Sequence, residues 1–124
     1  MILEYYRPDK LEDSLELLSR KSPHTIVLGG GLFINEVIKE PIAVVDIQEL
    51  GLDEIKTKGK GLEIGAGVTL QTLFNHPDCP LALKDAIKHQ ETYNRRQVAT
   101  VAGALVAANG RSSIPGVMLA LDAE

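Results

Sequence analysis

The sequence predicts an α/β fold of the α+β kind, in which a small parallel sheet is followed by an incomplete mixed α/β region. Short β-branched runs alternate with segments of helical period as far as Ile47. After Gly51, single apolar residues alternate with polar ones, and amphipathic helical segments follow. We therefore divide the chain into residues 1–50, a β-α-β-α-β unit, and residues 51–124.

The first half of the chain contains three predicted strands, at residues 3–6, 25–28 and 43–47. Their apolar runs are nearly continuous, which is typical of parallel strands that are buried on both faces. Helical segments separate the strands, and this alternation favours parallel pairing. The second of these helices is expected over residues 32–39, directly after three glycines.

The first helix carries its own start signal. Asp9 stands three residues before Glu12, and this spacing predicts a capping box with Asp9 as the N-cap. Leu11, Leu15 and Leu18 recur at the spacing of one helix face. We therefore expect these three leucines to pack against the sheet.

The second half begins with a predicted half-buried strand at residues 62–66, where apolar and polar side chains alternate. Thr69 is expected to cap a short helix that Pro77 ends. Residues 83–90 predict a second amphipathic helix, and Pro115 marks the start of the last one.

Composition and charge exclude several functions. The 124 residues carry 13 Lys and Arg against 17 Asp and Glu, a net charge of −4, so nucleic acid and anionic lipid are not expected partners. No apolar stretch approaches the ~20 residues of a membrane span, and the first residues lack a signal-peptide core, so we expect a cytoplasmic location. The single cysteine, Cys79, provides no internal disulfide, iron–sulfur cluster or cysteine-rich zinc site.

Three consecutive glycines, Gly29 to Gly31, join the second predicted strand to the helix that follows. Glycines let backbone amides turn toward an anion without obstruction by a Cβ, and a helix N-terminus adds further donors, so this loop could hold a pyrophosphate. A tight turn without a ligand explains the same residues. The loop is no dinucleotide fingerprint, which would need glycine at Ile34, and no Gly-Lys-Ser/Thr of a P-loop follows.

Other polar residues allow two interpretations each. Asp46, at the end of the third strand, could take the place of a ribose-binding acid, although a capping or turn role is favoured. Arg95 and Arg96 could neutralise a phosphate, or they simply close a helix. They adjoin residues 97–108, a neutral stretch rich in glycine and alanine that permits close backbone approach by a ligand or a neighbouring helix.

The sequence predicts no catalytic side chain and no metal site. His24, His76 and His89 lack the spacing of metal ligands, and no Gly-x-Ser-x-Gly elbow is present. Any redox chemistry would therefore depend on a bound cofactor.

Five segments in a fixed order resemble the FAD-binding subunit of molybdenum hydroxylases, the group that includes enzymes of the xanthine dehydrogenase and carbon monoxide dehydrogenase types. Each segment alone is weak, but their order and spacing together are fairly specific. They are LGGG at 28–31, VDI at 45–47, LEIGAGVTL at 62–70, RQVATVAG at 96–103 and LALDA at 119–123.

This resemblance implies an FAD-binding fold of the p-cresol methylhydroxylase type, with FAD between two subdomains. The first glycine loop would surround the FAD diphosphate through backbone amides, and the family's second loop, Thr-x-Gly-Gly-Asn, corresponds to residues 100–104. Ser113 stands where the family's Ser-Asp-x-x-Pro motif has an acidic FAD contact. The implied cofactor-binding residues are Leu28, Gly29, Gly30, Gly31, Leu32, Phe33, Thr100, Val101, Gly103 and Ser113.

The function that the resemblance implies is electron transfer in an oxidoreductase. FAD would receive electrons from a molybdenum and iron–sulfur partner and pass them to NAD or another acceptor. The flavin, not a side chain, would carry the chemistry, so the chain alone is not expected to be an active enzyme.

Three departures from the family motifs leave room for other functions. Ala102 replaces a glycine, where a Cβ would obstruct the ligand or forbid a positive φ, Ala104 replaces an asparagine, and Ser113 replaces an aspartate. One alternative is a non-enzymatic assembly module that has lost FAD binding. Another is a nucleotide-phosphate binder that uses only the first loop and Arg95 or Arg96.

Family members continue past the Leu-Asp-Ala helix, whereas this sequence stops at Glu124. The second subdomain is therefore expected to be truncated and to leave an apolar sheet edge. Such edges are commonly covered by another chain. We expect a homodimer or a higher oligomer that buries this edge.

Overall fold

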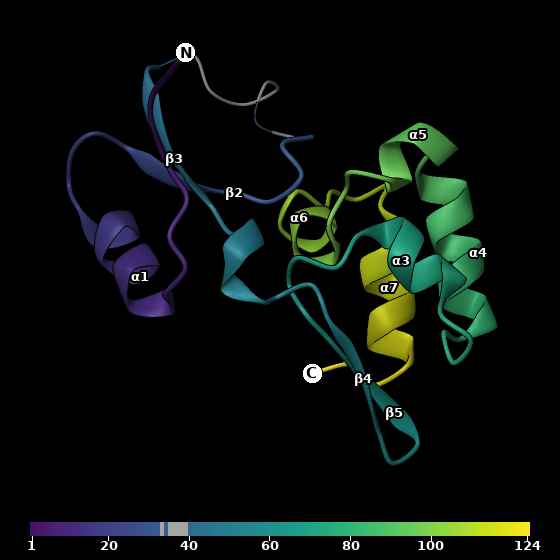
Figure 1. Ribbon diagram of the computed structural model, residues 1–124. Helices are drawn as coiled ribbons and strands as arrows, with labels where there is room; N and C mark the ends of the chain where they lie inside the picture. Colours follow the sequence, from purple (N-terminus) through teal and green to yellow (C-terminus); the bar gives the residue numbers. More distant parts are fainter. Residues whose placement is uncertain (33, 35–39) are drawn as a thin grey trace.

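The computed structural model describes residues 1–32, 34 and 40–124 (Figure 1). A three-stranded sheet with one helix on its side forms one part of the molecule, and a group of helices with a two-stranded hairpin forms the other. The helix predicted over residues 32–39 lies mostly outside the described residues. The mixed α/β class predicted from the sequence is confirmed.

The sheet of the first half is entirely parallel. Its strands are β1 (Ile2–Tyr6), β2 (Thr25–Leu28) and β3 (Ile42–Asp46), in the order β1-β3-β2. All five residues of β3 are buried, as its apolar run predicts, because it has a neighbour on each side. β1 and β2 are edge strands and are partly exposed, so the expectation of burial on both faces holds for β3 alone.

Helix α1 (Leu11–Ser19) packs beside this sheet but begins and faces differently from the prediction. The N-cap is Lys10, which makes no side-chain capping bond, so the predicted capping box with Asp9 is wrong. The buried residue of the helix is Ser14, whereas Leu11 and Leu15 are exposed. The small Ser14 side chain lets the helix backbone approach the sheet, and its hydroxyl donates to the carbonyl of Lys10.

A short 3-10 turn, η1 (Gln48–Leu50), leads from the sheet to an antiparallel hairpin of β4 (Ile55–Lys58) and β5 (Gly61–Ile64). The predicted strand at residues 62–66 is confirmed over its first three residues. β4 was not predicted because only one of its four residues is apolar, so no alternation is visible.

Helices make up the rest of the second half and enclose the larger hydrophobic core. They are α3 (Leu70–Asn75), α4 (Leu81–Gln90), α5 (Tyr93–Arg96), α6 (Val101–Val106) and α7 (Ser113–Ala120). The core residues below 2% exposed are Val68, Leu70, Leu73, Ile87, Ala99 and Ile114. No helix in the described ranges is long and apolar enough to span a bilayer.

Three predictions about these helices can be compared directly with the structure. Thr69 caps α3 through its hydroxyl, which accepts the amide of Thr72 at 3.1 Å, so this prediction is confirmed. α4 buries its predicted apolar face. Pro115 is the third residue of α7, not its start, and α6 occupies part of the stretch for which no helix was predicted.

Candidate functional site

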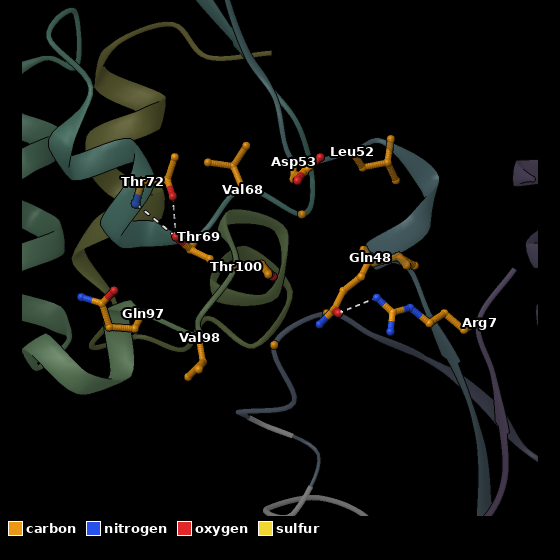
Figure 2. Close-up of a pocket in the computed structure, with 14 residues that line it drawn as sticks. Arg7, Gln48, Leu52, Asp53, Val68, Thr69, Thr72, Gln97, Val98 and Thr100 are labelled. Carbon is orange, nitrogen blue, oxygen red and sulfur yellow. Dashed lines mark hydrogen bonds between the residues drawn. The ribbon is translucent and has the colours of Figure 1, made fainter. Parts of the chain in front are cut away.

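A pocket of about 460 Å³ lies between the parallel sheet and the helical part (Figure 2). Its walls come from both halves of the chain. The lining residues are Arg7, Gly29, Gly30, Ile47, Gln48, Leu52, Asp53, Gly67, Val68, Thr69, Thr72, Gln97, Val98 and Thr100.

The position of the pocket follows from the parallel sheet. Arg7 comes directly after β1, Gly29 and Gly30 directly after β2, and Ile47 and Gln48 directly after β3. All three strands therefore deliver residues to the pocket from their carboxyl ends. In open α/β sheets, ligands bind at this edge because the backbone there diverges and leaves a crevice.

The glycine loop packs tightly against the segment before α6. A Cβ on Gly30 would lie 1.6 Å from the carbonyl oxygen of Val98, and one on Gly29 would lie 3.0 Å from the Thr100 hydroxyl. Gly31 has a φ of 74°, a conformation that a residue with a side chain rarely adopts. These contacts explain why glycine is needed here even before any ligand is considered.

The amides of the glycine loop are available to a ligand. Among the described residues, the backbone N–H groups of Gly29, Gly30 and Gly31 donate no hydrogen bond. Gly29 and Gly31 are half-buried and Gly30 is exposed. Three consecutive amides without a protein acceptor, beside a pocket, form a suitable site for an anion.

The predicted second loop, residues 100–104, has a structural role that differs from the predicted ligand contact. Thr100 is the N-cap of α6, and its hydroxyl accepts the amide of Gly103 at 3.1 Å. The amides of Val101 and Ala102 donate to carbonyls at residues 66–68, at 2.8 and 3.3 Å. Because these amides are already bonded, the second loop braces the glycine loop through Thr100 and offers few donors of its own.

The ten predicted cofactor-binding residues are thus not all in one place. Gly29, Gly30 and Thr100 line the pocket, whereas Leu28, Gly31 and Leu32 belong to the same loop but are not in its lining as described. Three others have different roles: Val101 is in the hydrophobic core, the Gly103 amide donates to the capping hydroxyl of Thr100, and Ser113 donates to the carbonyl of Ala86 at 3.3 Å. Phe33 lies outside the described residues.

The two alanines that depart from the family motif do not face the pocket. Ala102 lies within α6, and Asp122 is the one non-glycine residue in the described ranges with a positive φ, so Ala102 does not need the positive φ that only glycine adopts easily. Ala104 is 2% exposed and belongs to the core. An asparagine there would bury an amide rather than present it to a ligand.

Asp46 has the structural role that was favoured for it. Its Oδ1 accepts the amide of Gln48 at 2.9 Å and so holds the turn after β3, and its other oxygen accepts the hydroxyl of Tyr5. The hydrogen bond to Asp46 raises the pKa of the Tyr5 hydroxyl. Both carboxylate oxygens have partners, so Asp46 is poorly placed to bind a ribose.

The two adjacent arginines, Arg95 and Arg96, contact side chains of the helical part of the protein. Arg95 pairs with the buried carboxylate of Glu91 at 2.6 Å. Arg96 donates to Gln71 Oε1 at 3.0 Å and lies 5.0 Å from the ring centre of Phe74. Neither lines the pocket, which favours the structural interpretation over phosphate binding.

Reasoning from the sequence missed Arg7, Gln48 and Asp53. Arg7 Nη2 donates to Gln48 Oε1 at 3.3 Å, as Figure 2 shows, and forms an ion pair with Glu49 Oε1 at 2.7 Å. For Arg7 and Gln48 the sequence signal was their position directly after predicted strands, because residues at the carboxyl ends of parallel strands share one edge of the sheet. Asp53 lies six residues beyond its predicted strand and carried no such signal.

A glycine loop with unpaired amides, at the carboxyl edge of a parallel sheet and beside a pocket shared by two halves, is typical of nucleotide-binding folds. The whole chain, residues 1–124, matches the family described as the FAD binding domain in molybdopterin dehydrogenase. The chain belongs to this family, and the resemblance inferred from the sequence is confirmed.

Two curated relatives, both called uncharacterized protein YgfM, come from Escherichia coli strains K12 and O157:H7. Each is 33% identical to this chain over 127 residues. The alignment covers the whole chain but 49% of each relative, so the chain spans about half of their length.

Solved structures share the fold. Carbon monoxide dehydrogenase from Hydrogenophaga pseudoflava matches with a TM-score of 0.82 and 22% identity, over 94% of this chain and 44% of that one. Quinoline 2-oxidoreductase from Pseudomonas putida 86 matches with a TM-score of 0.79 and 22% identity, over 93% and 43%. At these identities the likeness concerns the fold alone.

Proposed function

We propose that this chain binds the diphosphate of FAD in the pocket and serves as the flavin-carrying component of a molybdopterin-dependent dehydrogenase. The observation that carries the proposal is the set of unpaired amides at Gly29, Gly30 and Gly31, at the edge of a pocket lined by both halves of the chain. Membership of the FAD-binding family supports the choice of FAD over other diphosphates.

The pocket fits one part of FAD better than the whole molecule. Its volume of about 460 Å³ is typical of a small-ligand site, and its lining combines glycine backbone, three threonines, two glutamines and one arginine. The described lining includes no aromatic side chain on which a flavin ring could stack. We therefore assign the pocket to the diphosphate and adenosine half, with the flavin ring extending beyond it.

Each group at the pocket has a definite task in this proposal. The amides of residues 29–31 donate to phosphate oxygens, and Thr69 and Thr72 present hydroxyls that lie 2.9 Å apart at the start of α3. Thr100 keeps the glycine loop in place from the opposite wall. FAD, when bound, supplies the electron-transfer chemistry, which no side chain of the pocket can provide.

In the complete assembly, we place this chain between a molybdenum and iron–sulfur partner and an acceptor such as NAD. The family description, which refers to molybdopterin dehydrogenases, supports a molybdopterin-containing partner. The order of electron transfer is part of the proposal. The identity of the oxidised substrate would be decided by the partner, because the pocket described here holds the flavin nucleotide.

Homo-oligomer formation through the second half of the chain stays a prediction, and exposed apolar side chains there support it. Val106 is 89% exposed and Leu119 is 74% exposed, both in helices of the second half. Light scattering at micromolar concentration should give a mass above that of one chain, and a monodisperse monomer would contradict the prediction. The cytoplasmic location predicted from the sequence also stays a prediction.

Binding of FAD and of ADP to the purified chain tests the proposal. We expect quenching of flavin fluorescence when the protein is titrated into FAD, and heat on titration with ADP. Gly110→Ala serves as a matched control, since a Cβ at this glycine meets open space away from the pocket. Binding of ADP without FAD would favour a nucleotide-phosphate binder, and no binding of either at tens of micromolar would favour the assembly module.

A further inference from the structure

Arg7 is the one cationic side chain in the described lining of the pocket. It follows the last residue of β1, on the edge strand opposite the one that carries the glycine loop. Asp53 is the one carboxylate in the same lining. A ligand that enters this pocket therefore meets one positive side chain, Arg7, and one negative side chain, Asp53.

The side-chain contacts of Arg7 bring its charge toward the centre of the sheet edge. Neighbouring strands lie about 4.8 Å apart, so the ends of β1 and β2 are separated by about 10 Å across β3. Arg7 Nη2 donates to Oε1 of Gln48, the second residue after β3. The guanidinium thus extends from β1 toward the central strand, on the side that faces Gly29 and Gly30.

The carboxylate of Glu49 competes with a ligand for the guanidinium of Arg7. Its Oε1 lies 2.7 Å from Arg7 Nη2, and both side chains are about half exposed. An ion pair of this kind contributes little stability because water screens it. The contacts of Arg7 with Gln48 and Glu49 are both made at Nη2, and its side chain also interacts with the Tyr5 hydroxyl. A guanidinium has five N–H donors and can meet a phosphate with two of them.

We propose that Arg7, positioned by Gln48, pairs with the diphosphate of the ligand whose other oxygens are held by the glycine amides. The inference rests on the proposed function for the choice of ligand. Glu49 acts against binding, since it neutralises Arg7 and repels the diphosphate. Arg7 then determines the preference of the pocket for a doubly charged nucleotide over an uncharged nucleoside.

Four variants test this assignment by calorimetric titration with ADP and fluorescence titration with FAD. A charge-assisted hydrogen bond is worth about 1.5–3 kcal/mol, so Arg7→Ala should weaken the binding of both ligands about 10- to 100-fold. Arg7→Lys should restore part of this loss. Glu49→Gln should tighten binding by up to about fivefold, in line with the small energy of an exposed pair. Arg111→Ala removes an exposed arginine away from the pocket and should change nothing.

The opposite signs of the two central variants separate ligand binding from structure. If Arg7 only stabilises the fold through Glu49, then Arg7→Ala and Glu49→Gln should weaken binding alike, and the inference is overturned. It is also overturned if Arg7→Ala binds ADP as the wild type and Arg111→Ala do. Thermal melts followed by circular dichroism should give all four variants the same melting temperature as the wild type.

The wild-type protein separates this inference from the proposed function. If it binds FAD and Arg7→Ala binds equally well, the assignment of Arg7 fails and the proposed function stands. If it binds ADP but not FAD, the proposed function fails, and the ADP series still decides the role of Arg7. Binding of neither ligand overturns both.

Discussion

Replacing Gly30 with alanine should separate the two walls of the pocket. The added Cβ would lie 1.6 Å from the carbonyl oxygen of Val98, whereas real Cβ atoms essentially never come closer than 3.0 Å to another heavy atom. The two segments must therefore move apart by more than 1 Å, on the order of a bond length. The obstacle is backbone, so a change of side-chain rotamer cannot relieve it.

The Val98 side of this contact cannot easily move. Its amide donates to Arg95, and the next residue, Ala99, is 1% exposed and accepts the amide of Leu70 at 2.8 Å. Overpacking against such a fixed neighbour costs about 1–3 kcal/mol of unfolding free energy. The glycine loop absorbs the remaining displacement, so its amides leave the positions in which they could converge on one anion.

Urea unfolding and ADP titration of the same samples measure both effects. The midpoint should fall with an unchanged slope, and ADP affinity should fall at least tenfold. Gly116→Ala is the control, because this glycine lies in α7 with open space at its Cβ and the change should stabilise the helix by up to about 1 kcal/mol. A Gly30→Ala protein with wild-type stability and wild-type ADP affinity would refute the packing described here.

Three further changes test other parts of the structure. Ala104→Asn should lower the unfolding free energy by about 1–3 kcal/mol, because it buries an amide in the core, and a gain of FAD binding by this variant would contradict that placement. Thr69→Ala should cost about 1 kcal/mol in thermal melts through loss of the α3 cap, whereas Thr69→Ser should cost little. The hydrogen bond from Arg20 lowers the pKa of Glu4 below its ordinary value of 4.5. The ionised Glu4 therefore stabilises the fold fully above pH 4.5, and this stabilisation is lost as the pH falls through the lowered pKa. The stability difference between the wild type and Glu4→Gln, measured in urea at pH 7 and pH 3, should therefore shrink at the lower pH; an equal difference at both would contradict the pair.

Local patterns in the sequence predicted the elements that depend on local physics. The strand at residues 25–28 has the predicted bounds, Thr69 caps its helix, and α4 buries the face that its period indicates. Each of these depends on residues within a few positions of one another. Where the pattern was weak, as in β4 with its single isoleucine, the element was missed.

The failures concern choices that are made between distant segments. Leu11 and Leu15 form a regular apolar stripe, yet α1 turns Ser14 to the sheet. The distance at which α1 packs on the sheet decides this orientation, since a small residue at the contact lets the helix approach more closely. Ser113 matches a family motif by position, but its hydroxyl bonds α4, because α7 packs there. Neither outcome can be read from neighbouring residues.

The sequence by itself determined the class of the fold, the family, and the glycine run at residues 29–31, because periodicity, order of motifs and the absence of side chains are properties of the chain. The tertiary structure alone decided what surrounds that run. The strand order β1-β3-β2 brings Arg7 and Gln48 to one edge although they are 41 positions apart in the sequence. The packing of the second half sets Val98 and Thr100 against the glycines, so these glycines are needed for packing as well as for the proposed ligand. The physical reason is that a binding pocket is made by groups that meet only after the sheet and the helices have packed.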